Sequence, residues 1–97
     1  MNLIDIPVLI IQSDDWEVIY IKGKKHKEGH GIPDQTWIEI GMLMHQENLS
    51  ILDIQSAGVY TSDVTNEELL WDFPENVNDL DAEVKNIILS NIESAYL

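Results

Sequence analysis

The stretch from Asp14 to His30 constrains the fold more than any other part of the chain, because it predicts a β-hairpin. Lys22-Gly23 can form a two-residue turn in which glycine takes a positive φ. Residues 24–30 return as a polar strand, which we expect at the sheet edge because lysines discourage edge-to-edge pairing. Two sets of side chains alternate along the first strand: Trp16, Val18 and Tyr20 on one face, and Glu17, Ile19 and Ile21 on the other.

The chain has 97 residues, which predicts a single domain over residues 1–97 with one modest hydrophobic core. Its apolar fraction of 44% is ordinary for a globular protein. It contains no cysteine, which excludes disulfides and thiolate zinc sites and suits a reducing compartment. The N-terminus lacks the basic region of a signal peptide, and the longest apolar run, Val8–Ile11, is too short to span a bilayer. We therefore expect a cytoplasmic protein that does not bind membranes.

The segments around the hairpin predict strands and one helix. Residues 3–12 read as a strand, and Val8–Ile11 is apolar on both faces, which indicates a central, covered position. Asp34 can cap a helix from Gln35 to about Gln46, although the alternation of residues 38, 40, 42 and 44 leaves a strand open. Asn48 fits a left-handed helix end. Residues 49–60 predict the next strand, with 51–54 as its clearest part and a bulge or turn at 56–58.

The C-terminal part predicts two helices. Thr65 and Glu68 fit a capping box that begins a short helix, which Pro74 ends. Asp81 can cap a last helix from residue 82 to about residue 96. The order β-β-β-α-β-α-α indicates an α+β fold: a small, mostly antiparallel sheet of about four strands with helices packed on one face. The inner face of the last helix is predicted to carry Val84, Ile87, Ile88, Asn91, Ile92, Ala95 and Tyr96.

The net charge of −13 is concentrated in the second half of the chain. Residues 1–46 contain seven acidic residues and four lysines, a net charge of −3. Residues 47–97 contain eleven acidic residues and one lysine, a net charge of −10. There is no arginine, the residue whose guanidinium best binds phosphates and base edges. Such a surface would repel nucleic acid and attract a basic protein, so we expect no direct nucleic-acid binding. The alternative is that the acidity serves only solubility.

One tryptophan among these acids marks the predicted partner-binding site. Residues 63–83 contain eight acidic residues and no lysine. Trp71 lies within this stretch, and we expect it to be exposed, because an aromatic anchor with a polar rim is typical of an interface centre. Trp16 and Trp37 are expected in the core or at its edge. The predicted site consists of Trp71, Asp72, Glu75, Asp79, Glu67 and Asp63.

The basic return strand is an alternative working surface. Short basic runs can bind anions or nucleic-acid segments. A solvated hairpin whose lysines balance nearby acids is the simpler interpretation. The residues of this alternative surface are Lys22, Lys24, Lys25 and Lys27.

Two histidines in the hairpin raise the alternative of a metal site or a small enzyme. His26 and His30 lie four residues apart with Glu28 between them. On an extended strand that spacing separates them by about 13 Å, so one ion would need a bend at Gly29 to reach both. Carboxylates from residues 14, 15 and 17 beside His30 could form a general acid–base pair. We expect no metal and no cofactor, but a pocket joining His30 to Asp14 or Asp15 would favour an enzyme.

The hairpin resembles a motif of small bacterial proteins of uncharacterised function. The matching residues are the Asp-Asp-Trp-Glu run at 14–17, Tyr20, Gly23-Lys24 and the Glu-Gly-His exit at 28–30. The Asp-Phe-Pro-Glu run at 72–75 and Asp79-Leu80 are similar to the C-terminal part of those proteins. The resemblance covers about a third of the chain and implies no activity.

These observations favour an acidic protein–protein interaction module. It would cover a basic surface of another protein, for example a nucleic-acid-binding protein, as an immunity protein or a bacterial or phage anti-defence inhibitor does. The runner-up is a small enzyme or metal-binding protein that uses His26, Glu28 and His30. A third reading is an oligomerising structural subunit, which a large exposed apolar patch would favour. We expect the chain to be a monomer or a homodimer.

Overall fold

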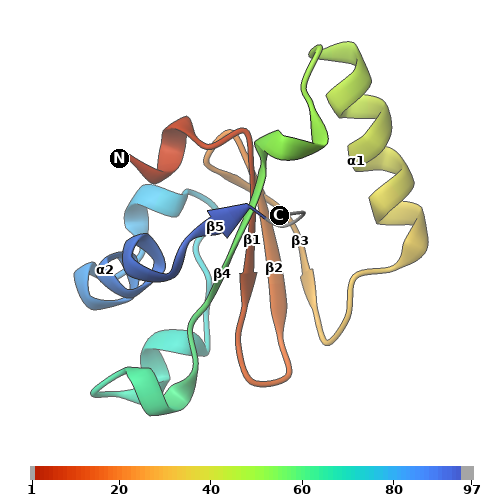
Figure 1. Cartoon of the computed structure of the whole chain (residues 1–97). Helices are drawn as coiled ribbons and strands as arrows, with labels where there is room; N and C mark the ends of the chain where they lie inside the picture. Colours follow the sequence, from red (N-terminus) through yellow and green to blue (C-terminus); the bar gives the residue numbers. More distant parts are fainter. Residues whose placement is uncertain (1, 95–97) are drawn as a thin grey trace.

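The computed structural model describes residues 2–94, which form a five-stranded mixed sheet between two helical layers (Figure 1). The spatial order of the strands is β3-β2-β1-β4-β5. The β1–β4 pair is parallel and the other neighbouring pairs are antiparallel, so the predicted α+β class with a small, mostly antiparallel sheet is confirmed. The strands are β1 (Val8–Gln12), β2 (Glu17–Ile21), β3 (Lys24–Gly29), β4 (Ile54–Gly58) and β5 (Glu93–Ser94).

The two α-helices cover opposite faces of the sheet: α1 (Asp34–Gln46) on one side and α2 (Ala82–Asn91) on the other (Figure 1). This corrects the expectation that the helices pack on one face. Neither helix has both the length and the apolar character that crossing a bilayer requires, over the residues that the structure describes. Short 3-10 segments complete the fold: Leu3–Asp5, Ile51–Asp53, Thr61–Asp63, Glu67–Leu70 and Val77–Asp79.

The central strand explains why both faces are covered. Residues 8–11 are all buried, as the run of apolar residues on both faces predicts. Leu9 and Ile11 belong to the larger core, which α2 enters with Val84 and Ile88. Val8 and Ile10 belong to a smaller core on the other face, which α1 closes with Ile40 and Met44. A strand that is apolar on both faces needs a packing layer on each face of the sheet, and α2 and α1 provide them.

The predicted hairpin and its turn are confirmed. Lys22 has φ 50° and Gly23 has φ 83°, the left-handed conformations that a two-residue hairpin turn requires. A Cβ at Gly23 would lie 2.5 Å from Ile4 Cγ1, so the glycine also permits close packing of the N-terminal segment. The basic strand β3 lies at the sheet edge, as expected. The register shifts between Ile19 and Tyr20, which pair with Lys27 and Lys25 and leave His26 as the extra residue.

The connection between α1 and β4 differs from the prediction. Asn48 has φ 59°, in agreement with a left-handed helix end. The Ser50 side chain and the Asp53 carboxylate then form a reciprocal capping box that turns Ile51–Asp53 into a 3-10 segment. The predicted strand therefore begins only at Ile54 and continues through residues 56–58, where a bulge or turn was expected.

The C-terminal part also differs in detail. Thr65 donates its backbone N–H and its hydroxyl to the Glu83 carboxylate, both at 2.7 Å, and Asn66 caps the following 3-10 segment instead. Asp81 caps α2 as predicted, and Asp34 begins α1 rather than preceding it. Helix α2 ends at Asn91, earlier than predicted. The predicted inner-face positions Ala95 and Tyr96 lie outside the described residues.

Candidate protein-binding site

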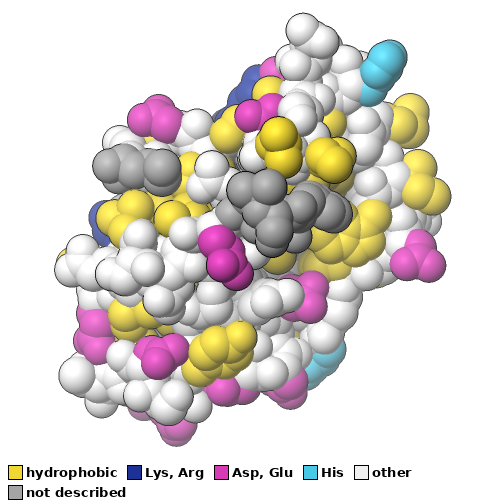
Figure 2. All heavy atoms as spheres, in the orientation of Figure 1, with side chains coloured by type: hydrophobic (Ala, Val, Ile, Leu, Met, Phe, Trp, Pro, Cys, Tyr) yellow, Lys and Arg dark blue, Asp and Glu magenta, His cyan; other side chains and the backbone are white. Residues whose placement is uncertain are grey.

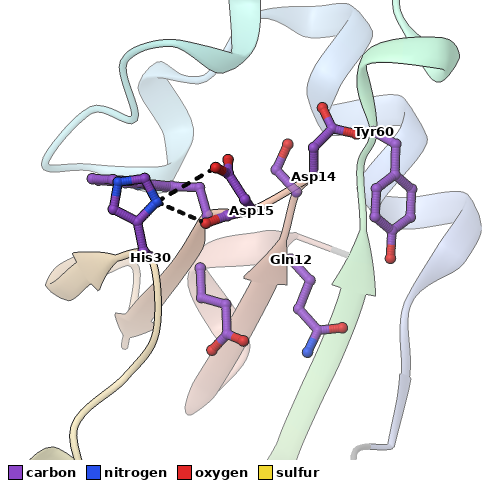
Figure 3. Close-up of a pocket in the computed structure, with 8 residues that line it drawn as sticks. Gln12, Asp14, Asp15, His30 and Tyr60 are labelled. Atoms are coloured by element: carbon purple, nitrogen blue, oxygen red, sulfur yellow. Dashed lines mark hydrogen bonds and ion pairs between the residues drawn. The ribbon is translucent and has the colours of Figure 1, made fainter.

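The loop between β1 and β2 opens a hollow of about 290 Å³ at one end of the sheet, which we call the acidic hollow. Asp14 lies between Tyr60 on one side and Asp15 with His30 on the other (Figure 3). The loop is closed by a hydrogen bond from the Ser13 N–H to the Trp16 carbonyl at 2.8 Å. The acidic hollow is lined by Gln12, Ser13, Asp14, Asp15, Trp16, Glu17, His30 and Tyr60.

Parallel pairing of β1 with β4 explains how these residues meet. Gln12 pairs with Gly58, so the C-terminal ends of β1 and β4 lie at the same end of the sheet. The β1–β2 loop and the segment that follows β4 both begin at that end of the sheet (Figure 1). The Thr61 N–H reaches the Asp14 carboxylate at 3.4 Å. A Cβ at Gly58 would lie 2.7 Å from the Tyr60 ring, so the missing side chain leaves room for that ring.

His30 and Asp15 lie next to each other inside the acidic hollow. His30 Nδ1 lies 3.5 Å from an Asp15 carboxylate oxygen and 3.2 Å from the Asp15 carbonyl oxygen (Figure 3). Their side chains are 76% and 85% exposed. The pair therefore stands in water, where a protonated histidine gains little from a carboxylate.

Trp16 is held at the wall of the acidic hollow by two contacts. Its indole N–H donates to a Glu28 carboxylate oxygen at 3.2 Å. Its ring meets the His30 ring edge-on, with centroids 4.8 Å apart and planes at 80°. The tryptophan is partly buried against the larger core, as the sequence predicts.

The Glu28 carboxylate also ties the hairpin to the segment around Pro74. Lys25 donates to Glu28 at 2.7 Å and to the Phe73 carbonyl at 2.9 Å. The Tyr20 hydroxyl donates to the Pro74 carbonyl at 2.7 Å, and burial raises the pKa of this phenol, so it stays protonated. These bonds hold residues 73–75 against the sheet.

Burial and hydrogen bonding act in opposite directions on Glu28. Burial alone would raise the pKa of its carboxyl, but the hydrogen bonds from Lys25 and Trp16 outweigh it, so the pKa lies below its usual value. The hydrogen bond that Lys25 donates to Glu28 in turn raises the pKa of Lys25. Both groups are therefore charged at neutral pH, which keeps Trp16 in place.

A second hollow of about 230 Å³ adjoins the first, and we call it the tryptophan hollow. It is lined by Asp15, Trp16, Leu70 and Trp71, so Asp15 and Trp16 form a wall common to both hollows. Trp71 is 69% exposed, which confirms the expectation that this tryptophan lies at the surface. An exposed indole beside a carboxylate and a second indole is available for contact with another molecule.

The predicted acidic residues do not all gather around Trp71. Asp72 follows it directly, and Glu67 is exposed on the preceding 3-10 segment. Asp63 accepts the Tyr60 N–H at 3.0 Å and lines a separate hollow beside α2. Glu75 lies 3.6 Å from Lys25, and Asp79 ends a 3-10 segment that packs against Leu3–Asp5. The predicted site left out Asp14, Asp15 and Tyr60, which the parallel β1–β4 pairing brings to one hollow.

The alternative metal site is not assembled. His26 Nε2 lies 3.7 Å from Glu39 on α1, whereas His30 pairs with Asp15 and Glu28 bonds to Lys25 and Trp16. His26 is therefore directed toward α1, whereas Glu28 and His30 both contact Trp16. Over residues 2–94, no group of three or more histidine or carboxylate side chains could hold a metal ion.

Two of the four lysines of the alternative basic surface are engaged in ion pairs. Lys22 pairs with Glu47 beyond α1, and Lys25 is occupied by Glu28 and the Phe73 carbonyl. Lys24 and Lys27 are exposed on β3. The four lysines therefore point to different surroundings rather than forming one anion site.

Exposed apolar side chains form a different feature on α1. Ile38 and Met42, one helical turn apart, are 64% and 62% exposed. Figure 2 shows hydrophobic side chains at the surface over this helix, at the right edge of the view. Ile51 and Leu52 in the next 3-10 segment are exposed as well.

Comparison with known proteins finds no matching family model, no matching curated protein and no matching solved structure. The resemblance of the hairpin to small bacterial proteins therefore stays a hypothesis.

Proposed function

We propose that this protein is an acidic interaction module that binds a basic surface of another protein through one end of its sheet. We call this surface the acidic–aromatic end; it comprises Asp14, Asp15, Trp16, Tyr60 and Trp71. The observation that carries the proposal is the common wall of Asp15 and Trp16, which places an acidic and an aromatic hollow side by side. The predicted residues Asp63, Glu67, Asp72, Glu75 and Asp79 would extend this surface as an acidic rim.

The distribution of charge supports the proposal. On the face seen in Figure 2, most Asp and Glu side chains lie over the lower half, toward the β1–β2 loop, and Lys side chains reach only the upper left margin. A net charge of −13 would attract a basic partner over a distance and raise the rate of association. We infer an inhibitor of the immunity or anti-defence type, acting in the cytoplasm on a basic protein such as a nucleic-acid-binding protein.

The acidic hollow also contains the combination that would favour an enzyme, His30 with Asp14 and Asp15. The exposure of His30 and Asp15 decides against it, because general acid–base catalysis profits from groups held away from water. Charge attraction needs no such shielding. We therefore place binding before catalysis.

The test starts with capture of the partner from the source organism with tagged protein, followed by association kinetics with the purified partner. Asp72→Lys and Asp15→Lys should each slow association several-fold, and added salt should slow the wild-type protein. Lys24→Glu, on β3 directly after the hairpin turn, should leave association unchanged or make it faster. If only Lys24→Glu slows association, the basic hairpin is the working surface and the proposal is wrong.

Self-association is the second candidate function, and the exposed pair Ile38 and Met42 on α1 favours it. Sedimentation velocity at increasing protein concentration measures it directly. If the helix mediates a homodimer, Met42→Glu should return the chain to a monomer, whereas Asp15→Lys should not.

A further inference from the structure

We propose that the acidic–aromatic end recognises an extended segment in which an arginine and an apolar residue are two positions apart. This inference rests on the proposed function and names the chemistry of the partner at that site. The arginine would enter the acidic hollow, and the apolar side chain would enter the tryptophan hollow.

The acidic hollow fits a guanidinium better than an ammonium. Asp14 and Asp15 from the β1–β2 loop offer carboxylates, and the aromatic residues Trp16 and Tyr60 belong to the same lining. A guanidinium can bond a carboxylate through two N–H groups and stack on an aromatic ring at the same time. A lysine ammonium is a compact, strongly hydrated charge that uses such a wall less well.

The tryptophan hollow fits an apolar side chain. Its lining combines Trp16, Leu70 and the largely exposed Trp71 with a single carboxylate from Asp15. Its volume of about 230 Å³ leaves room for one leucine-sized or aromatic side chain. Covering Trp71 would remove apolar surface from water, which supplies affinity that the exposed carboxylates cannot supply alone.

The common wall requires the two bound side chains to lie close together in the partner segment. Because Asp15 and Trp16 line both hollows, one short segment can reach both. In an extended peptide, side chains on the same face are two residues apart, a rise of about 6.6 Å. An arginine and an apolar residue at positions i and i+2 therefore match two adjoining hollows.

A second copy of this chain cannot be the occupant. The sequence contains no arginine at all, so no segment of another copy supplies the guanidinium. Two chains of net charge −13 would also repel one another at their acidic ends. The occupant is therefore a different, basic protein.

The three indole N–H signals in an NMR spectrum report on binding without any label on the ligand. Trp16 and Trp71 line the tryptophan hollow, and Trp37 lies on α1 against the other core. We would titrate three peptides: Gly-Arg-Gly-Leu-Gly, the same peptide with lysine for arginine, and the same peptide with uncharged citrulline. The arginine peptide should shift the signals of Trp16 and Trp71 but not that of Trp37, and should bind several-fold more tightly than the lysine peptide. The citrulline peptide should bind at least tenfold more weakly than the arginine peptide.

Matched variants separate this inference from the proposed function. Asp14→Asn with Asp15→Asn should abolish the preference for arginine over citrulline, whereas Asp34→Asn at the start of α1 should keep it; circular dichroism checks that both fold. If the arginine and lysine peptides bind equally at Trp16 and Trp71, the arginine inference is wrong while binding of a basic partner stands. If no peptide shifts those two signals, or if only Trp37 responds, the inference fails, and the association kinetics decide on the proposed function independently.

Discussion

At the scale of single residues, a few side chains hold the acidic–aromatic end in place. Glu28 accepts the Trp16 indole N–H with one oxygen and pairs with Lys25 through the other. Lys25 in turn donates to the Phe73 carbonyl, close to Trp71 in the chain. One carboxylate therefore links the tryptophan of the β1–β2 loop to the segment that carries the exposed tryptophan.

Glu28→Gln should lower the free energy of unfolding by about 0.5–1.5 kcal/mol at pH 7, the net value of hydrogen bonds to a charged group at a partly exposed site. The folded pKa of Glu28 lies below its usual value of 4.5, so its contribution is present above that pH and is lost as the pH falls through the folded pKa. Urea unfolding of both proteins should show their difference shrinking as the pH falls below 4.5 and through the folded pKa. An unchanged difference between pH 7 and pH 3, or an equal effect from Glu67→Gln, would contradict this role.

Gly23→Val should destabilise the protein by more than about 1 kcal/mol, because a β-branched residue tolerates a positive φ poorly. The new Cβ would also meet Ile4 at 2.5 Å. Gly31→Val is the matched control, since a Cβ at Gly31 meets nothing within 4 Å. Equal melting midpoints for the two variants would refute the assignment of the turn.

At the scale of elements, the sheet is well supported and α1 is its less protected neighbour. Strand β2 is paired on both sides, with β1 and β3, and β1 is covered on both faces. Helix α1 buries Thr36, Ile40 and Met44 but leaves its outer face to solvent, including Gly41 near its middle. A glycine within a helix lowers its stability and here has no close neighbour that requires it.

Gly41→Ala should therefore raise the free energy of unfolding by about 0.5–1 kcal/mol, because alanine loses less backbone freedom on folding. Thermal unfolding followed by circular dichroism would measure the gain. A loss of stability would show that the backbone at this position cannot accept a side chain.

Local patterns predicted some elements and missed others for identifiable reasons. The alternating residues of β2 and the Lys22-Gly23 turn are local signals, and both agree with the structure. The sequence places the start of this strand too early, because Ile51 and Leu52 are apolar, as in a strand. Ser50 and Asp53 instead form a capping box around a 3-10 segment, and β4 begins at Ile54. The faces covered by α1 and α2 depend on contacts between distant segments, which periodicity within one segment does not reveal.

At the scale of the whole molecule, strand topology and charge determine what the protein can bind. Trp71 was predicted to be exposed from its acidic surroundings, but its neighbours Asp15 and Trp16 come from a loop more than fifty residues away. The parallel β1–β4 pair, together with the bonds from Lys25 and Tyr20 to residues 73 and 74, brings the two segments to the same end of the sheet. The sequence therefore predicts the exposure of Trp71, and the topology determines which residues lie beside it.

Net charge should also affect stability. At an ionic strength of about 0.01 M the Debye length is ~30 Å, which exceeds the radius of gyration of 12.8 Å, so charges repel one another across the molecule. At about 0.15 M it falls to ~8 Å. We expect the melting midpoint to rise by several degrees over this range and to rise less in a triple variant, Glu67→Gln, Asp79→Asn and Glu93→Gln. A midpoint that is independent of salt would contradict this.

Hydrogen exchange on the complex tests the central claim most directly, because it maps the contact surface without any substitution. With the partner captured from the source organism, the backbone amides of residues 13–17 and 60–72 should exchange more slowly in the complex than in the free protein. Residues 24–29 of the basic strand and 35–46 of α1 should exchange at the same rate in both. Protection confined to the basic strand or to α1, with unchanged exchange at 13–17 and 60–72, would contradict binding through the acidic–aromatic end.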